Sequence, residues 1–197
     1  MASVSLVATI VLVRHGETDW NREHRFQGHA DIPLNDAGRA QARQVAEQFV
    51  DEPVSAIYTS PLRRAAETAR IIAARLELEA RPLEPLREID VGAWEGLTID
   101  EVRSRYPGRS DENWHAGWTD GETYDELAAR VVPALVELGS RHDDGLVLAI
   151  THAGPIRAAL AASLGVSQDE ARRRIGPLAN GALLRVVVRD GELHAVD

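Results

Sequence analysis

The sequence predicts one α/β domain in which a mostly parallel central sheet lies between two layers of helices. Residues 7–13 and 146–150 are continuous apolar runs rich in branched side chains, a pattern typical of parallel strands that are covered on both faces. Segments with helical periodicity alternate with these strands along the chain. Together the two observations predict a three-layer α/β/α sandwich.

The remaining elements follow from periodicity and turn residues. A shorter strand is expected at residues 55–58, and residues 182–188 and 192–196 flank Arg189-Asp190-Gly191 as a terminal hairpin. Asn35 is placed to cap the first long helix, and Ser60 with Pro61 to begin the second. The expected helices span residues 36–50, 62–76, 122–141 and 155–164.

The stretch of residues 89–121 differs from the rest of the chain. It is rich in glycine, tryptophan and charged residues, with one short helical piece at residues 98–105. Such an excursion between core elements usually forms a lid or a wall that sets specificity. We expect Trp94, Trp114 and Trp118 to pack this lid rather than to stack on bases.

Composition limits the partners. The chain has 197 residues, which suits one domain (residues 1–197), and carries a formal net charge of −9 without a basic block. Nucleic acid and anionic membranes are therefore not expected as partners. The apolar run at residues 6–13 lacks the basic flank of an export signal, so a buried strand and a cytoplasmic location are expected.

Two residue types are missing. The chain has no cysteine, and all 22 of its basic residues are arginine. Thiolate chemistry, Schiff bases and lysine-dependent P-loops are thereby excluded. His24, His29, His115, His142 and His194 show no metal-ligand spacing, so neither a metal nor a cofactor is expected. For covalent catalysis, histidine is the leading nucleophile.

Both long strands run into a histidine. Arg14-His15-Gly16 follows the first, and Thr151-His152-Ala153-Gly154-Pro155 follows the second. Ligands of open α/β sheets bind beyond the carboxyl ends of the strands, where a helix N-terminus also attracts anions. Arg63, in the first turn of the helix after Ser60, is expected at the same place, and Arg64 is expected to be a solvated partner of Glu67. The arrangement predicts a phosphate site.

In these motifs the chain resembles the phosphoglycerate-mutase-like branch of the histidine phosphatase superfamily. The matching motifs cover nearly the whole chain in family order: residues 12–21 (LVRHGETDWN), 26–28 (FQG), 34–38 (LNDAG), 59–69 (TSPLRRAAETA), 86–96 (LREIDVGAWEG), 120–123 (DGET) and 151–154 (THAG). The resemblance implies the phosphoglycerate-mutase-like form of the predicted sandwich.

The resemblance also implies roles for individual residues. His15 would attack phosphorus and become a phosphohistidine, while Arg14, Arg63 and His152 would neutralise the phosphoryl oxygens. Glu88 would protonate the leaving alcohol, a role that the chemistry alone could equally give to Glu84, Asp90 or Glu95. The implied substrate-binding set further includes Asn21, Gln27, Gly28 and Ala153.

The favoured activity is metal-independent hydrolysis of a small-molecule phosphate monoester. The alternative is a cofactor-dependent phosphoglycerate mutase, which shares this machinery. Residues 111–122 hold four acidic residues and no arginine, so we expect them to repel a second anionic group on the substrate. A remote alternative is an inactive phosphate-binding module. The oligomeric state stays open, with a homodimer as one option.

Overall fold

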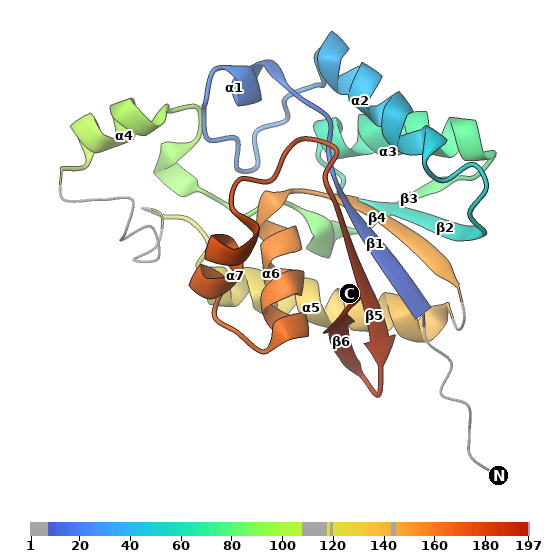
Figure 1. The fold of residues 1–197 in the computed structure, drawn as a ribbon. Coiled ribbons are helices and arrows are strands. Elements are labelled where there is room, and N and C mark those ends of the chain that lie inside the picture. Colours follow the sequence, from blue (N-terminus) through green and yellow to red (C-terminus); the bar gives the residue numbers. More distant parts are fainter. Residues whose placement is uncertain (1–7, 108–117, 119, 143–144, 197) are drawn as a thin grey trace.

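The computed structural model describes residues 8–107, 118, 120–142 and 145–196 (Figure 1). It has a six-stranded sheet in the order β3-β2-β4-β1-β5-β6, in which β3, β2, β4 and β1 run parallel, β5 is antiparallel to β1, and β6 is antiparallel to β5. The predicted fold class is confirmed. The strands are β1 (Ala8–Arg14), β2 (Val54–Thr59), β3 (Ala80–Pro82), β4 (Leu146–Thr151), β5 (Leu183–Arg189) and β6 (Glu192–Ala195).

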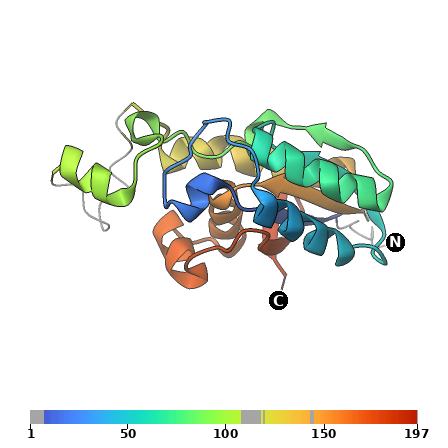
Figure 2. The same cartoon turned by 90° about the horizontal axis from the view of Figure 1, so that it is seen from above.

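Helices cover both faces of the sheet (Figure 1). Helices α2 and α3 pack on one face, and α5 and α6 pack on the other. The short pieces η1, η2 and α4 follow β3 and lead away from the sheet toward one side of the molecule (Figure 2). The helical elements are α1 (Asp19–Arg22), α2 (Asp36–Glu47), α3 (Arg63–Leu76), η1 (Glu84–Leu86), η2 (Gly92–Trp94), α4 (Ile99–Arg105), α5 (Tyr124–Arg141), α6 (Ala153–Leu164) and α7 (Gln168–Ile175).

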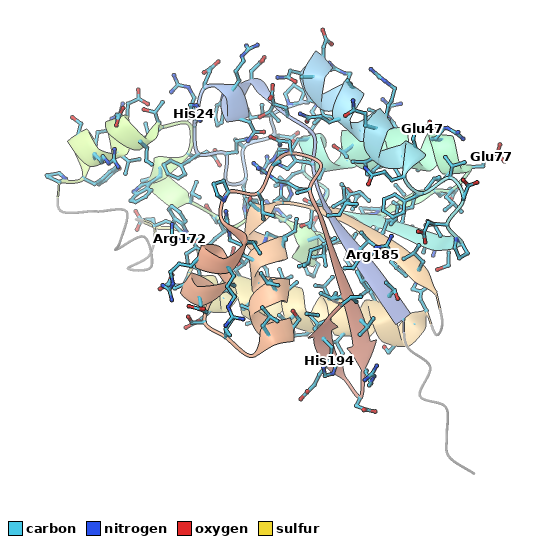
Figure 3. All side chains as sticks on the ribbon, in the orientation of Figure 1. His24, Glu47, Glu77, Arg172, Arg185 and His194 are labelled. Carbon is cyan, nitrogen blue, oxygen red and sulfur yellow. The ribbon has the colours of Figure 1, made fainter. Side chains whose placement is uncertain are left out.

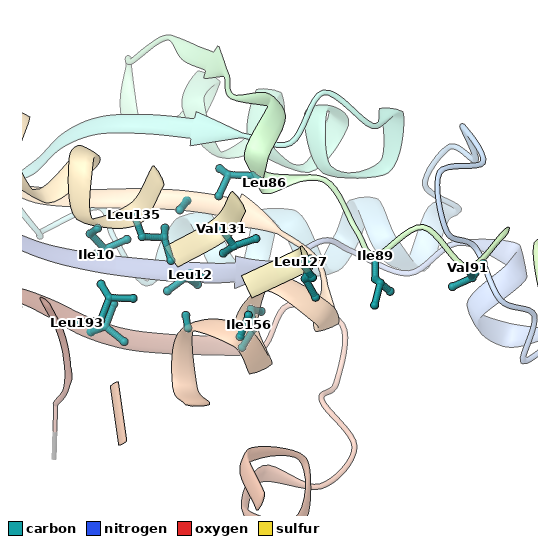
Figure 4. Packing of buried hydrophobic residues seen from close by; sticks show 14 of the residues in the cluster. Ile10, Leu12, Leu86, Ile89, Val91, Leu127, Val131, Leu135, Ile156 and Leu193 are labelled. Carbon is teal, nitrogen blue, oxygen red and sulfur yellow. The ribbon is translucent and has the colours of Figure 1, made fainter. Parts of the chain in front are cut away.

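Strand β1 shows why its sequence is apolar without alternation. Ile10 and Leu12 point into the cluster beneath α5 and α6, which Figure 4 shows together with Val131 and Leu135. Val11 and Val13 point into the opposite cluster beneath α2 and α3. Because both faces of the strand are buried, every position needs an apolar side chain.

Two helices begin elsewhere than predicted. Helix α3 starts at Arg63 after Leu62, whose side chain makes no capping hydrogen bond, so Ser60 and Pro61 are not its cap and first residue. Ser60 is instead fully buried and pairs with His152. Helix α6 starts at Ala153 with His152 in the N-cap position. Helix α7 was not predicted, since it is a polar surface helix with only Ala171 buried.

The described part of the 89–121 segment confirms apolar packing of two tryptophans. The rings of Trp94 and Trp118 meet edge to face with centroids 5.0 Å apart, and Phe26 contacts both. Trp114 and most of the acidic stretch 111–122 lie outside the described residues. Among the residues that the structure describes, no helix is both long and apolar enough to cross a lipid bilayer.

Candidate active site

The carboxyl ends of β1 and β4 meet as the sequence predicts. The two strands are parallel neighbours in which Arg14 pairs with Thr151, so His15 and His152 follow at the same edge. Their rings are 5.1 Å apart between centroids, and both side chains are almost fully buried. A cavity of about 380 Å³ lies next to this pair, lined by residues that include Arg14, His15, Asn21, Arg64 and Glu88 but not His152.

Hydrogen bonding fixes the tautomer of His15. Its Nδ1 lies 2.7 Å from the carbonyl oxygen of Gly16, which can only accept, so Nδ1 carries the proton. Nε2 is therefore left with a free lone pair. Burial lowers the pKa of His15 well below its usual value, and the charges of Arg64 and Arg14 lower it further. The ring is therefore neutral at neutral pH, with Nε2 unprotonated.

The loop after His15 is held against α2. A Cβ on Gly16 would lie 2.3 Å from the carbonyl oxygen of Gly38, so only glycine permits this approach of the two backbones. The Gly16 amide donates to Thr68 Oγ1 of α3 at 3.1 Å, and the Glu17 amide donates to Gln41 Oε1 of α2 at 2.8 Å. The position of His15 is thus set by main-chain contacts on both sides.

Two arginines bring positive charge to this end of the cavity. Arg64 donates to the carbonyls of Gly28 and Ala30 at 2.9 and 2.8 Å, and Arg14 donates to the carbonyl of Leu178. In both guanidinium groups Nε is buried without a hydrogen-bond partner among the described residues. Burial lowers the pKa of Arg64 to about 10, so it stays charged at neutral pH. Two cations held this close are stabilised by negative charge, part of which Glu88 supplies.

The prediction for Arg63 is wrong, and Arg64 takes its place. Arg63 is exposed, does not line the cavity, and has its backbone amide bound to Asp31 at 2.7 Å. Arg64 is only 1% exposed because it lies on the buried face of α3 with Thr68 and Ile72, at a spacing of four residues. That spacing was visible in the sequence. Glu67, the expected partner of Arg64, instead pairs with Arg39 at 2.8 Å.

Asn21 reaches the cavity from α1 with its amide orientation fixed. Its Oδ1 accepts from the Thr18 amide and hydroxyl, both at 3.1 Å, and from Asn180 Nδ2 at 3.2 Å. The Nδ2 group is therefore the part of Asn21 left to donate to a ligand. Asn180 also donates to the His15 carbonyl at 3.0 Å, a link that the sequence analysis missed because 165 residues separate the two.

His152 is a buried imidazole beside His15. Its Nε2 lies 2.8 Å from Ser60 Oγ, which also accepts from the Leu62 amide. A hydroxyl oxygen can accept two hydrogen bonds and donate one, so this contact is compatible with either tautomer of the ring. The Nδ1 atom of His152 is buried without a partner among the described residues. Burial and the charge of Arg64 lower the pKa of His152 well below its usual value, so the ring is neutral at neutral pH and does not add the positive charge that was expected of it.

Glu88 lies across the start of helix α6. Its Oε1 accepts from the backbone amides of Gly154 and Ile89, both at 2.9 Å. The Gly154 amide, at the helix N-terminus that was expected to attract an anion, thus binds Glu88. The backbone carbonyl of Glu88 accepts from Arg130 Nη2 at 2.9 Å and from His29 Nε2 at 2.8 Å. Glu88 is the carboxylate that these contacts aim into the cavity, which the sequence alone did not single out.

The other predicted binding residues divide into two groups. Gln27 and Gly28 line the cavity, and Gly28 has a φ of +47° that favours glycine. Ala153 begins α6 between His152 and Gly154 but is not among the residues that line the cavity. Among the described residues no three histidine or acidic side chains are grouped as a metal site would need.

Comparison with known proteins agrees with this geometry. Residues 10–197 match the family model of the histidine phosphatase superfamily (branch 1). The chain is 42% identical over 161 residues to phosphoglycerate mutase-like protein 4 of Arabidopsis thaliana, covering 77% of this chain and 69% of that one. It is 35% identical over 161 residues to phosphoserine phosphatase 1 of Hydrogenobacter thermophilus, covering 80% and 76%. The solved structure of YhfR from Bacillus stearothermophilus superposes with a TM-score of 0.87 at 32% identity, covering 96% and 95%.

Proposed function

Because the chain belongs to branch 1 of the histidine phosphatase superfamily, we propose that it hydrolyses small-molecule phosphate monoesters through a phosphohistidine on His15, without a metal ion. The observation that carries the proposal is the state of His15. The ring is neutral, its Nδ1 is bound to Gly16, and it lies between two buried arginines at the base of a cavity. A neutral imidazole surrounded by cations suits attack on an anionic phosphoryl group.

In the first step, His15 Nε2 attacks phosphorus and the bond from phosphorus to the ester oxygen breaks. Arg14, Arg64 and Asn21 would hold the phosphoryl oxygens through their unpartnered donors, and His152 would donate from Nδ1 in the tautomer that carries its proton there. Glu88, protonated at this stage, would give its proton to the departing alkoxide. The products of this step are an alcohol and phosphohistidine.

In the second step, water attacks the phosphohistidine. Glu88, now ionised, would take a proton from the water as its oxygen bonds to phosphorus. The bond from phosphorus to Nε2 breaks, and inorganic phosphate leaves with His15 restored. The same carboxylate can serve both steps because the amides of Gly154 and Ile89 bind only Oε1, which leaves Oε2 to carry or accept the proton.

The proposal is tested with 4-nitrophenyl phosphate in buffer containing EDTA. We expect wild-type turnover to persist in the chelator and the His15→Ala variant to lose about 10⁴-fold or more in kcat, as when a covalent nucleophile is removed. Alkaline quenching should trap an acid-labile phosphoenzyme on His15. No wild-type turnover would favour the phosphate-binding module, and label on serine or aspartate would exclude His15 as nucleophile.

A mutase shares every residue of this mechanism and differs in the acceptor of the second step. One relative is named a phosphoglycerate mutase-like protein and another a phosphoserine phosphatase, so similarity alone does not choose between the two reactions. Hydrolysis is favoured by the acidic stretch at residues 111–122, which would repel the bisphosphate that a mutase needs. Sustained, bisphosphate-dependent isomerisation of 3-phosphoglycerate would overturn this choice. The expected cytoplasmic location stays a prediction.

A further inference from the structure

Two arginines outside the proposed phosphate-binding set line the same cavity. Arg157 lies on α6, three residues after Gly154, so that both face the cavity from one side of the helix. Arg172, which Figure 3 labels on α7, lines the cavity as well. The charge of Arg157 is close enough to contribute to the lowered pKa of Arg14. The cavity therefore has a second cationic region, supplied by helices that contribute nothing else charged to its lining.

These two side chains lack the partners that the neighbouring arginines have. Arg25, which also lines the cavity, is bound to Glu23, Glu101 and the Gly96 carbonyl. Neither Arg157 nor Arg172 makes an ion pair or donates a hydrogen bond to any residue that the structure describes, and Nε of each is buried. Each of these buried Nε groups has lost its hydration without gaining a hydrogen bond in the protein. A bound anion would supply the missing hydrogen bonds.

The local charge balance indicates how much negative charge would fit. The phenol of Tyr124 lies at the start of α5. The charges of Arg157, Arg172, Asp169 and Glu88 are all close enough to it to act on its pKa. Glu88 is bound to the start of α6 and faces Arg14 and Arg64 as well. Asp169 and Glu88 offset part of the positive charge of the two arginines, so a singly charged carboxylate fits there better than a dianionic phosphate.

We propose that Arg157 and Arg172 form a subsite for a carboxylate on the alcohol part of the substrate, so that the enzyme selects carboxylate-bearing phosphate monoesters. Arginine suits this task because its planar donors match the two oxygens of a carboxylate. The inference rests on the proposed function. It limits the expectation drawn from residues 111–122, which then excludes a second phosphate group on the substrate but not a carboxylate.

The test uses substrate pairs that differ only at the carboxylate. The pairs are 3-phosphoglycerate with glycerol 3-phosphate, and O-phosphoserine with phosphoethanolamine. Wild-type kcat/KM should be higher for the carboxylated member of each pair. Arg157→Gln and Arg172→Gln should each lower that ratio by about 10- to 100-fold, the cost of losing a hydrogen bond to a charged group, mainly through KM.

Arg173→Gln is the matched control. Arg173 is adjacent to Arg172 on α7 but is exposed and paired with Glu170 at 2.7 Å, so its substitution should leave the ratio unchanged. Circular dichroism and Tm verify that each variant is folded. Because Arg157→Gln and Arg172→Gln are tested separately, the inference can still be tested if one of them is unstable. Equal use of both members of each pair by an active wild type would overturn the inference. A preference for fructose 1,6-bisphosphate over fructose 6-phosphate would overturn the choice of carboxylate. Absence of 4-nitrophenyl phosphate hydrolysis would overturn the proposed function instead.

Discussion

The two ends of the cavity are built in different ways. At the His15 end, nearly every functional group is fixed by the main chain: His15 by Gly16, Arg64 by Gly28 and Ala30, and Glu88 by Gly154. In the rest of the lining, which we call the Arg172 end, the side chains of Arg157, Arg172, Ile99 and Trp118 come from helices or from the 89–121 segment. There the two arginines have no partner among the described residues.

We infer from this difference that the residues at the His15 end carry out the reaction, whereas those at the Arg172 end select the substrate. Phosphoryl transfer requires donors held to within a fraction of an ångström, and strand ends with backbone hydrogen bonds provide that precision. The alcohol part of the substrate is recognised by side chains on helices that can vary without moving the sheet. Changes at the His15 end should therefore reduce turnover of all substrates, whereas changes at the Arg172 end should alter their ranking.

After the loss of His15 itself, the largest effect is expected when the two adjacent arginines of α3 are replaced one at a time. Arg64→Gln should lower kcat/KM for 4-nitrophenyl phosphate by about 100- to 1,000-fold, as for other lost transition-state donors. Arg63→Gln is the matched control and should change it by less than about twofold, because surface substitutions rarely matter. Steady-state kinetics on both variants checks this. Similar losses in the two variants would contradict the placement of Arg64 alone at the cavity.

A smaller and selective effect is expected from Glu88→Gln. Glutamine retains an oxygen for the amides of Gly154 and Ile89 but has no proton to transfer. We expect kcat/KM to fall by about 100-fold for alkyl phosphates and by much less for 4-nitrophenyl phosphate, whose leaving group needs no proton. A leaving-group series measures this dependence. Equal losses across the series would show that Glu88 does not act as the proton donor.

Asn180→Ala tests whether the precision at the His15 end depends on a residue outside the cavity lining. The substitution removes donors to the His15 carbonyl and to Asn21 Oδ1. A lower kcat, by about tenfold, is expected for all substrates because a small displacement of the nucleophile slows attack. The ratio between carboxylated and neutral substrates should not change. A change in that ratio would contradict the separation of the two ends.

The smallest effect is the pH dependence of stability. The pKa values of His15 and His152 are lowered, mainly by burial, so the folded state holds both rings neutral while the unfolded chain protonates them near their usual pKa of 6.5. Their contribution to stability is therefore fully present above pH 6.5 and is lost as the pH falls below that value toward the folded-state pKa values. Tm measured from pH 7.5 to 4.5 should decline on the acidic side, and less in His15→Asn. A Tm that rises with acidification would contradict the assignment.

Much of the fold could be predicted because its cause is local. The apolar runs that became β1 and β4 can only be buried on both faces, and Asn35 caps α2 through the Gly38 amide at 2.8 Å as expected. Helix α7 escaped prediction because its sequence is polar, with only Ala171 buried. The start of α3 was misplaced because the Ser60 hydroxyl, a good cap in isolation, is bound to a histidine 92 residues away.

The sequence by itself determined the strand ends that carry His15 and His152, and hence the region of the sheet where the site lies, since parallel strands bring their carboxyl ends together. Only the tertiary structure decided which of Arg63 and Arg64 enters the cavity, because that depends on the rotation of α3 against Gly16. It also decided that Glu88 occupies the start of α6 and that Arg157 and Arg172 come together, because these contacts join segments distant in sequence. Local patterns encode which segments are buried, whereas the groups that face one another across a cavity are set by packing.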